Sequence, residues 1–319
     1  MQEAEGVRKP GMRRGRRSLL VVCTVAVVIH LVPLLLLPRT EPEQQLFIAR
    51  AMSTVPQRVA FLRPMKDDAQ ATTAELREAA SLLLGGAPDE AHALALEAER
   101  RGPEEVETQL LLARICDVER MSRCVRTALS RAESLAPGDA RPDVLRAELL
   151  EKSGDVAGAA DSLEKAHGKA PEDALIGLRY VGMLSAARRG DEALAVLRKL
   201  EGHVPPARIL VEQGRVHGRE GRDAEAVKLF RAAVAEDPKL SVGHFELGLA
   251  WHRLGRLDAA EEALRRADRL ALADPKALAA LCAIQLKEQR IDDARLTRMD
   301  LERRFSGQPE LIRQSCSIP

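Results

Sequence analysis

Histidine and cysteine are the side chains of this sequence that could bind a metal ion or act in catalysis. The chain of 319 residues contains seven histidines and five cysteines. No two histidines are spaced i, i+4 and no Cys-x-x-Cys occurs, so the spacings typical of zinc sites are missing. The sequence also lacks a glycine-rich phosphate loop and a Gly-x-Ser-x-Gly motif. We therefore expect a non-enzymatic protein with no catalytic residues, no metal site and no cofactor.

The distribution of charge argues against nucleic acid as a partner. The formal net charge is +1, but residues 1–17 contain six basic and two acidic side chains, so the remainder carries −3. Binding to phosphate groups requires a concentrated basic surface, which a nearly neutral chain of mixed charge does not provide. We expect a protein or peptide as the partner.

A run of 20 residues without a formal charge, residues 18–37, predicts a transmembrane helix. At about 1.5 Å per residue the run spans roughly 30 Å, the thickness of the hydrocarbon core of a bilayer. A cleaved signal peptide is the alternative, but its apolar region is usually shorter, and no small-x-small cleavage pattern follows here. The basic residues before the run place the N-terminus in the cytoplasm by the positive-inside rule.

The remainder of the chain is organised by a repeat that is clearest between residues 207 and 275. Glycines, alanines and large apolar residues recur there in the same order. The matched pairs, each 34 residues apart, are Gly214 and Gly248, Gly221 and Gly255, Ala226 and Ala260, Phe230 and Leu264, and Ala233 and Ala267. The small residue that opens the second half of each unit can be traced through Ala91, Val125, Ala159, Ala193, Ala226, Ala260 and Ala294. In several units a glycine precedes it by five residues and a proline follows it by twelve, as expected for two helices joined by a tight turn.

This pattern resembles the tetratricopeptide repeat, whose helix–turn–helix unit is 34 residues long. The resemblance implies an all-α fold, a right-handed superhelical solenoid of about seven units, preceded by the transmembrane helix. The units are expected to start near Thr72, Val106, Ala140, Ala174, Ala207, Ser241 and Pro275. The predicted segments are a basic cytoplasmic segment 1–17, a transmembrane anchor 18–37, a linker 38–71, the repeat array 72–308 and a C-terminal tail 309–319.

Three departures from the repeat pattern carry structural expectations. Arg188 stands where the fourth unit should have its turn glycine. Pro275 and Pro309 come three residues late, so the second helices of the last two units should be longer than the others. Arg298 replaces the apolar side chain of the seventh unit, as expected for a terminal unit with an uncovered outer face.

The linker has no repeat signature, but it should contain one helix. We expect this helix over residues 43–53. We also expect Phe47, Ile48 and Phe61 to pack against the first repeat.

The resemblance also implies a binding groove lined by the first helix of each unit. In the family, positions 2, 5, 9, 12 and 13 of the unit point into that groove. Carried onto units five and six, the candidate groove residues are Arg208, Val211, Arg215, Arg219, Phe245, Leu249, His252 and Arg253. Stacked arginines beside an aromatic ring suit an extended peptide or a C-terminal carboxylate. The alternative is a solvated face whose arginines keep the array soluble.

The cysteines outside the predicted membrane span form two candidate disulfide pairs. Cys116 falls near the end of the first helix of unit two and Cys124 at the start of the second. Cys282 falls at the close helix contact of unit seven, and Cys316 lies in the tail. An oxidising compartment would permit a disulfide within each pair, and buried or free thiols are the alternative.

Together these features predict a membrane-anchored scaffold or adaptor that binds a peptide or partner protein in its groove. We expect a single-pass protein of a bacterial inner membrane, with a periplasmic array that serves cell-envelope assembly, export or maturation. Bacterial origin is inferred from an alanine- and arginine-rich composition without asparagine. One alternative is a regulatory subunit that faces the cytoplasm and docks a separate enzyme at the membrane. Another is self-association into a homo-oligomer through the last unit.

Overall fold

The computed structural model describes residues 41–317, so the predicted basic segment and membrane anchor lie outside the described range. Within that range the elements are helical, apart from an isolated bridge between Glu201 and Val204. None of the helices between residues 41 and 317 combines the length and apolarity needed to cross a bilayer. The described residues divide into two compact units, one ending at Cys124 and one beginning at Val125, so the boundary lies inside α7 (Ser122–Leu135). We call them unit 1 and unit 2 and describe each by itself.

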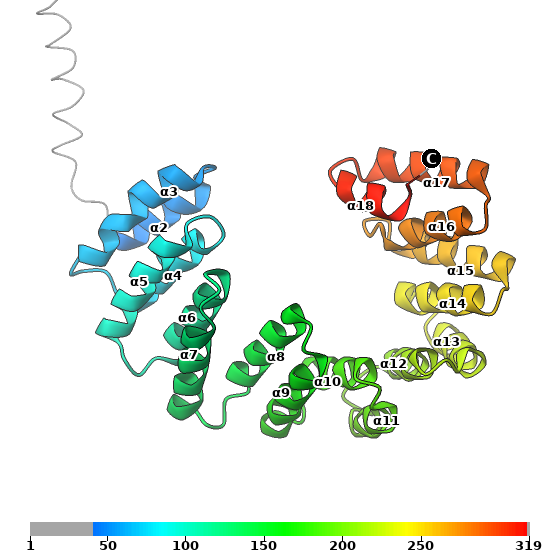
Figure 1. The fold of residues 1–319 in the computed structure, drawn as a ribbon, viewed down its shortest axis with the longest axis horizontal. Helices are drawn as coiled ribbons and strands as arrows, with labels where there is room; N and C mark the ends of the chain where they lie inside the picture. Colours follow the sequence, from blue (N-terminus) through cyan, green and yellow to red (C-terminus); the bar gives the residue numbers. More distant parts are fainter. Residues whose placement is uncertain (1–40, 318–319) are drawn as a thin grey trace, which may run out of the picture. The chain divides into compact units, whose positions relative to one another are not determined.

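The described part of unit 1 is built from stacked helical hairpins (Figure 1). Its elements before α7 are α2 (Pro42–Ala51), α3 (Val55–Leu62), the 3-10 helix η1 (Arg63–Asp67), α4 (Thr73–Leu84), α5 (Pro88–Arg101) and α6 (Val106–Val118). α4 pairs with α5, and α6 packs on α5. Thr72 and Glu75 form a capping box at the start of α4, which satisfies free backbone N–H groups of its first turn.

The predicted linker is itself a hairpin, because α2 and α3 pair with each other and both contact α4. The inner stripe of α2 is formed by Leu46 and Ala49, which are buried. Phe47 and Ile48 lie off that stripe and are 72% and 40% exposed, so their expected packing on the first repeat is wrong. Residues three apart share a helix face, whereas their immediate neighbours are rotated away from it. Phe61 is partly buried.

Unit 2, described by itself, contains five helical hairpins and a short final helix (Figure 1). After α7 its helices are α8 (Arg141–Ser153), α9 (Val156–Lys169), α10 (Ala174–Ala186), α11 (Gly190–Lys199), α12 (Pro206–Arg219), α13 (Asp223–Glu236), α14 (Ser241–Arg253), α15 (Leu257–Leu270), α16 (Lys276–Lys287), α17 (Ile291–Arg304) and α18 (Pro309–Ser315). Each even-numbered helix from α8 to α16 pairs with the helix that follows it. In both units, the first helix of each predicted repeat starts within one residue of its expected position.

The turn inside each hairpin of unit 2 uses a residue in the left-handed region, five positions before the small residue of the second helix. In unit 2 this residue is Gly154, Gly221 or Gly255, with φ of 85°, 79° and 72°. Arg188 and Gln289 adopt the same conformation at the equivalent places, with φ of 63° and 60°. The missing glycine in the fourth repeat therefore leaves the turn intact, although a side chain there is strained.

The second helices of the last two repeats are not lengthened. α15 and α17 each contain 14 residues, the same length as α9 and α13. The expectation of longer helices is therefore wrong. Instead of ending a longer helix, Pro275 is the N-cap residue of α16, and Pro309 is the first residue of α18.

Close approach between paired helices explains the small residues of the repeat. Ala226 and Ala260 are completely buried. A Cβ atom on Gly214 would lie 2.5 Å from Cε1 of Phe230, and one on Gly248 would lie 2.7 Å from Cγ of Leu264. Because the protein interior is close-packed, these contacts are available only to glycine unless the large partner moves.

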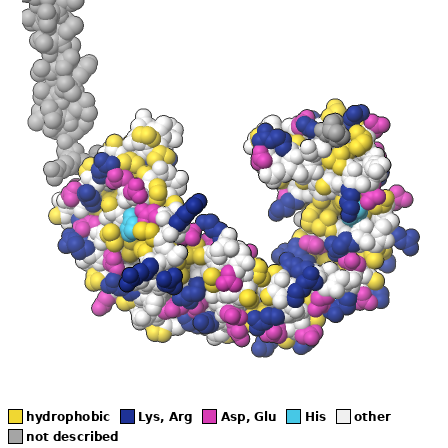
Figure 2. All heavy atoms as spheres, viewed as in Figure 1, with side chains coloured by type: hydrophobic (Ala, Val, Ile, Leu, Met, Phe, Trp, Pro, Cys, Tyr) yellow, Lys and Arg dark blue, Asp and Glu magenta, His cyan; other side chains and the backbone are white. Residues whose placement is uncertain are grey.

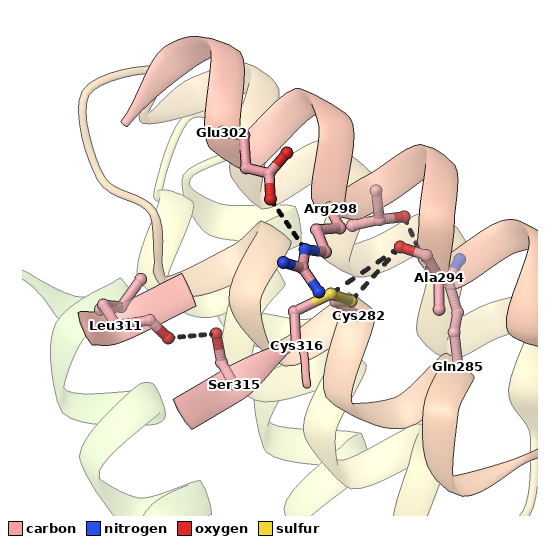
Figure 3. Close-up of a disulfide and its surroundings, with 9 residues drawn as sticks. Cys282, Gln285, Ala294, Arg298, Glu302, Leu311, Ser315 and Cys316 are labelled. Atoms are coloured by element: carbon pink, nitrogen blue, oxygen red, sulfur yellow. Dashed lines mark hydrogen bonds and ion pairs between the residues drawn. A yellow bond between two sulfur atoms is a disulfide. The ribbon is translucent and has the colours of Figure 1, made fainter. Parts of the chain in front are cut away.

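The last hairpin is covered by α18, which packs against both α16 and α17 (Figure 3). Ile312 of α18 is buried, and a disulfide joins Cys316, just after this helix, to Cys282 of α16. Arg298 is partly buried and donates to Glu302 at 2.8 Å. The expectation of an uncovered terminal unit is therefore wrong, because the tail supplies the cap.

Candidate functional site

A cavity of about 690 Å³ lies on the face of unit 2 that is built by α10, α12 and α14. These are the first helices of three consecutive repeats, and α12 contacts both of the others. A second cavity, of about 320 Å³, is lined by residues from α12, α14 and α16. Arg208 and Arg215 line both cavities, which therefore adjoin. Figure 2 shows Lys and Arg side chains gathered over the α10–α12 part of unit 2.

Five of the eight predicted groove residues line these two cavities. Arg208, Arg215, Arg219 and Arg253 line the larger one. Phe245 lines the smaller one.

The other three predicted groove residues line neither of the two cavities. Val211 is fully buried in the core with Phe230, so it is not available to a partner. Leu249 is partly buried. His252 lies 3.9 Å from Glu288 through its Nδ1 atom, and 15% of its side chain is exposed. The family position of a residue therefore does not by itself decide whether it reaches the groove.

The predicted groove residues do not include any from α10, which also contributes to the larger cavity. Leu175, Leu178, Gly182 and Ser185 of this helix line the larger cavity. Counted from Ala174, they occupy positions 2, 5, 9 and 12 of the fourth repeat. The same family rule, applied to that repeat, would have identified them.

Arg215 is held by two carboxylates inside the cavity wall. Its Nε atom donates to Glu246 of α14 at 2.8 Å, and its Nη1 atom donates to Glu212 of α12 at 2.9 Å. Burial opposes the charged form of Arg215, but the two carboxylates outweigh it and raise the pKa of the guanidinium. The guanidinium is thus already occupied, and it is unsuited to a bidentate bond with a ligand.

The other arginines of the larger cavity differ in their partners, and Nη2 of Arg179 lies 3.1 Å from Glu151. Nε of Arg208 lies 3.0 Å from Glu212, and Nε of Arg253 lies 2.5 Å from Asp223. Arg219 instead donates to the carbonyl oxygen of Gly182 at 2.9 Å, and among residues 41–317 no carboxylate pairs with it. Its side chain is exposed. Arg219 is therefore the cavity arginine whose charge an incoming anion could neutralise.

Apolar and unsatisfied polar groups complete the larger cavity. Leu175 is 77% exposed, and Leu178 and Val216 line the same cavity. The hydroxyl oxygen of Ser185 is buried in the same wall and has no hydrogen-bond partner among residues 41–317. A buried polar group without a partner costs free energy, so a ligand that bonds to Ser185 would gain from it.

Comparison with known proteins agrees with this architecture. Residues 184–241 and 243–275 match the family model of the tetratricopeptide repeat. No curated protein matches the chain in sequence.

Two solved structures illustrate what the chain is similar to. One is a tetratricopeptide repeat protein from Parabacteroides merdae ATCC 43184, with 17% identity and a TM-score of 0.55, covering 76% of this chain and 98% of that one. The other is PilW, described as a widely conserved type IV pilus biogenesis factor, with 18% identity and a TM-score of 0.48, covering 65% of this chain and 96% of that one. At 17% identity, the likeness to the Parabacteroides protein concerns the fold alone. The described residues form an all-helical solenoid of the tetratricopeptide repeat fold.

Proposed function

We propose that this tetratricopeptide repeat protein is a non-enzymatic scaffold that binds an extended segment of a partner protein in the larger cavity of unit 2. The observation that carries the proposal is the combination of Arg219, whose guanidinium has no carboxylate partner within residues 41–317, with the exposed side chain of Leu175 in one cavity. Stacked helical repeats commonly use such a face for protein recognition.

The two features define the chemistry of the segment. An apolar side chain of the partner would cover Leu175 and Leu178, and burial of apolar surface would supply most of the affinity. A carboxylate of the partner would pair with Arg219, which fixes the direction of the bound chain. Arg215 takes no part in direct binding, because Glu212 and Glu246 already occupy it.

We also propose that residues 18–37 anchor the protein in a membrane, with the N-terminus in the cytoplasm and the repeat array on the other side. The uncharged run and the basic residues before it support this arrangement. A fusion of alkaline phosphatase to the C-terminus should be active. A fluorescent protein fused at the same position and exported by the same route should not fluoresce. The opposite result would reverse the topology and favour the regulatory subunit that faces the cytoplasm.

The binding proposal is tested by site-specific photo-crosslinking in cells. A photoreactive amino acid at position 175 should capture a discrete partner. The same group at position 231, on the exposed surface of α13, should not.

The matched variants separate binding from folding. Arg219→Glu should abolish crosslinking from position 175, because it reverses the charge that the partner meets. Arg231→Glu makes the same charge change on an exposed arginine of α13 and should leave crosslinking unchanged. If Arg219→Glu retains full crosslinking while the array stays folded, the cavity is not the binding site.

A further inference from the structure

Unit 1 brings together three side chains that can bind a metal ion. A ring nitrogen of His92 and the sulfur atoms of Cys116 and Cys124 all lie within 4.8 Å of one another. The three residues come from three successive helices, α5, α6 and the first turn of α7. Cys116 is fully buried, and the other two are partly buried. In the structure the two cysteines form a disulfide, with their Cα atoms 5.8 Å apart.

His92 makes the second contact that a metal-binding histidine commonly makes. Its Nδ1 atom lies 2.6 Å from Oε2 of Glu119, and only 19% and 12% of the two side chains are exposed. A histidine that binds a metal commonly donates its other ring N–H to a carboxylate, which fixes the tautomer and the direction of the ring. With Nδ1 bonded to Glu119, Nε2 is the nitrogen left for a metal ion. Formation of the Cys116–Cys124 disulfide does not by itself require the contact between His92 and Glu119.

We propose that reduction of the Cys116–Cys124 disulfide creates a zinc site formed by His92, Cys116 and Cys124. A thiol reductant transfers two electrons and two protons to the disulfide, giving two thiols, and is itself oxidised to a disulfide. Each thiol then releases its proton as its sulfur binds Zn²⁺, so two thiolates and one neutral imidazole hold the ion. Zinc prefers four ligands, so the fourth position is open to water. Glu119 is a positioning residue that acts through His92.

The disulfide and the metal site exclude each other, because both use the same two sulfur atoms. The connection between α6 and α7 would thus be closed by a covalent bond under oxidising conditions and by zinc under reducing conditions. The Cα separation of 5.8 Å lies within the usual range for a disulfide, and the side chains can rotate apart once the bond is broken. The spacing of the three ligands along the chain matches no zinc motif, which is why the sequence did not reveal the site.

The test uses the full-length protein, purified and then reduced with a phosphine. Cys23, Cys282 and Cys316 are replaced by serine in the parent protein, so that reduction exposes only the cysteine pair of unit 1. Co²⁺ is then added as a spectroscopic probe of the zinc site. The reduced parent should develop thiolate-to-cobalt charge-transfer absorption in the near ultraviolet, and added Zn²⁺ should remove it. The oxidised parent should show neither signal.

Variants of the parent identify the ligands and the positioning residue. Cys116→Ser and Cys124→Ser should each abolish the charge-transfer signal or leave it at a much weaker affinity. Glu119→Gln keeps all three ligands and should weaken cobalt binding by about 10- to 100-fold, the usual effect of losing such an outer partner. Asp89→Asn, on the exposed start of the same helix as His92, should leave the affinity unchanged.

Two outcomes would overturn the proposal. One is a cobalt affinity in Cys116→Ser and Cys124→Ser equal to that of the reduced parent, and the other is an unchanged affinity in Glu119→Gln. If a cysteine variant loses its helical circular dichroism, the variant is unfolded and its cobalt affinity is not informative. Alkylation of the thiols in the reduced parent then tests the zinc site. Zn²⁺ should protect Cys116 and Cys124 from alkylation, and full reactivity in its presence would contradict a zinc site.

Discussion

Arg215 of α12 bonds to Glu246 of α14, with its Nε atom 2.8 Å from Oε1 of the glutamate, and so links two successive repeats of unit 2. Glu212 completes the arrangement from within α12, and its side chain is only 7% exposed. The repeat pattern predicts that Arg215 is one of several stacked arginines that bind a ligand. The structure shows that its charge is used inside the protein, to join neighbouring repeats and to neutralise an otherwise buried carboxylate.

Replacement of Arg215 by alanine should therefore destabilise unit 2 rather than merely weaken binding. The substitution leaves Glu212 nearly buried with only Arg208 beside it, and it breaks the contact to α14. Because Arg215 is partly exposed, we expect a loss of about 2 kcal/mol, between the values for surface and buried ion pairs. Urea denaturation monitored by circular dichroism measures it. Arg231→Ala should cost almost nothing, and equal stabilities of the two variants would contradict a structural role for Arg215.

The repeat pattern was sufficient to predict where the first helices begin, because the turn residues and small contact residues act locally. It predicted less well what happens at the ends of the array. α2 and α18 carry no repeat signature, yet they cover the first and last hairpins. The apolar face of a terminal helix must be buried against another element, and that element need not be a repeat. The cavity was predicted only in part. The family positions identify candidate side chains such as Arg215, but not the carboxylates that neutralise them, because the ion pair to Glu246 joins different repeats.

The left-handed turn of the last repeat offers a stabilising substitution. Gln289 has a φ of 60°, a conformation that costs a residue with a Cβ atom about 1 kcal/mol, and no side-chain bond of Gln289 compensates within the described chain. Relief of this strain should stabilise Gln289→Gly by about 1 kcal/mol, and the greater freedom of glycine in the unfolded state should offset part of that gain. Thermal denaturation measures the change.

The reverse substitution one repeat earlier is the matched control. Gly255 occupies the same turn position with a φ of 72°, and an added Cβ would meet no atom within 4 Å. Gly255→Ala should lower stability by a similar amount through backbone strain alone. A lower melting temperature for Gln289→Gly would show that the side chain of Gln289 has a role that its conformation does not explain.

The lowered pKa of Glu97 predicts how the stability of unit 1 changes at acidic pH. Hydrogen bonds from Arg100, assisted by Arg101, lower the pKa of this carboxyl from 4.5 to about 2, although partial burial acts in the opposite direction. A carboxyl with a lowered pKa in the folded state stabilises the protein above its ordinary pKa. That contribution is lost as the pH falls from about 4.5 towards about 2. NMR titration of the Glu97 carboxyl carbon should give a midpoint near the lower value.

Two substitutions of Arg100 separate charge from hydrogen bonding. Arg100 is largely exposed and bonds to Glu97 through two nitrogens, at 2.8 and 2.7 Å. Arg100→Ala should raise the pKa of Glu97 towards its usual value. Arg100→Lys keeps the charge but loses the paired bonds, so it should raise the pKa less. Identical titrations of Glu97 in both variants and the wild type would show that Arg101 alone sets the pKa.

The disulfide between Cys282 and Cys316 should hold the C-terminal cap in place. It spans a sequence separation of 34 residues, for which chain entropy predicts a stabilisation of roughly 3–4 kcal/mol. α18 has only seven residues, too few to form a stable helix alone, so its position on α16 and α17 depends on this bond and on buried Ile312. Cys316→Ser should therefore release α18 and speed amide hydrogen exchange in α16 and α17, with little change in α12 and α13, because stacked repeats interact mainly with their neighbours.

Cys124→Ser removes the other disulfide and serves as the control, since it should leave exchange in α16 and α17 unaltered. Unchanged exchange in Cys316→Ser would mean that apolar contacts alone hold the cap.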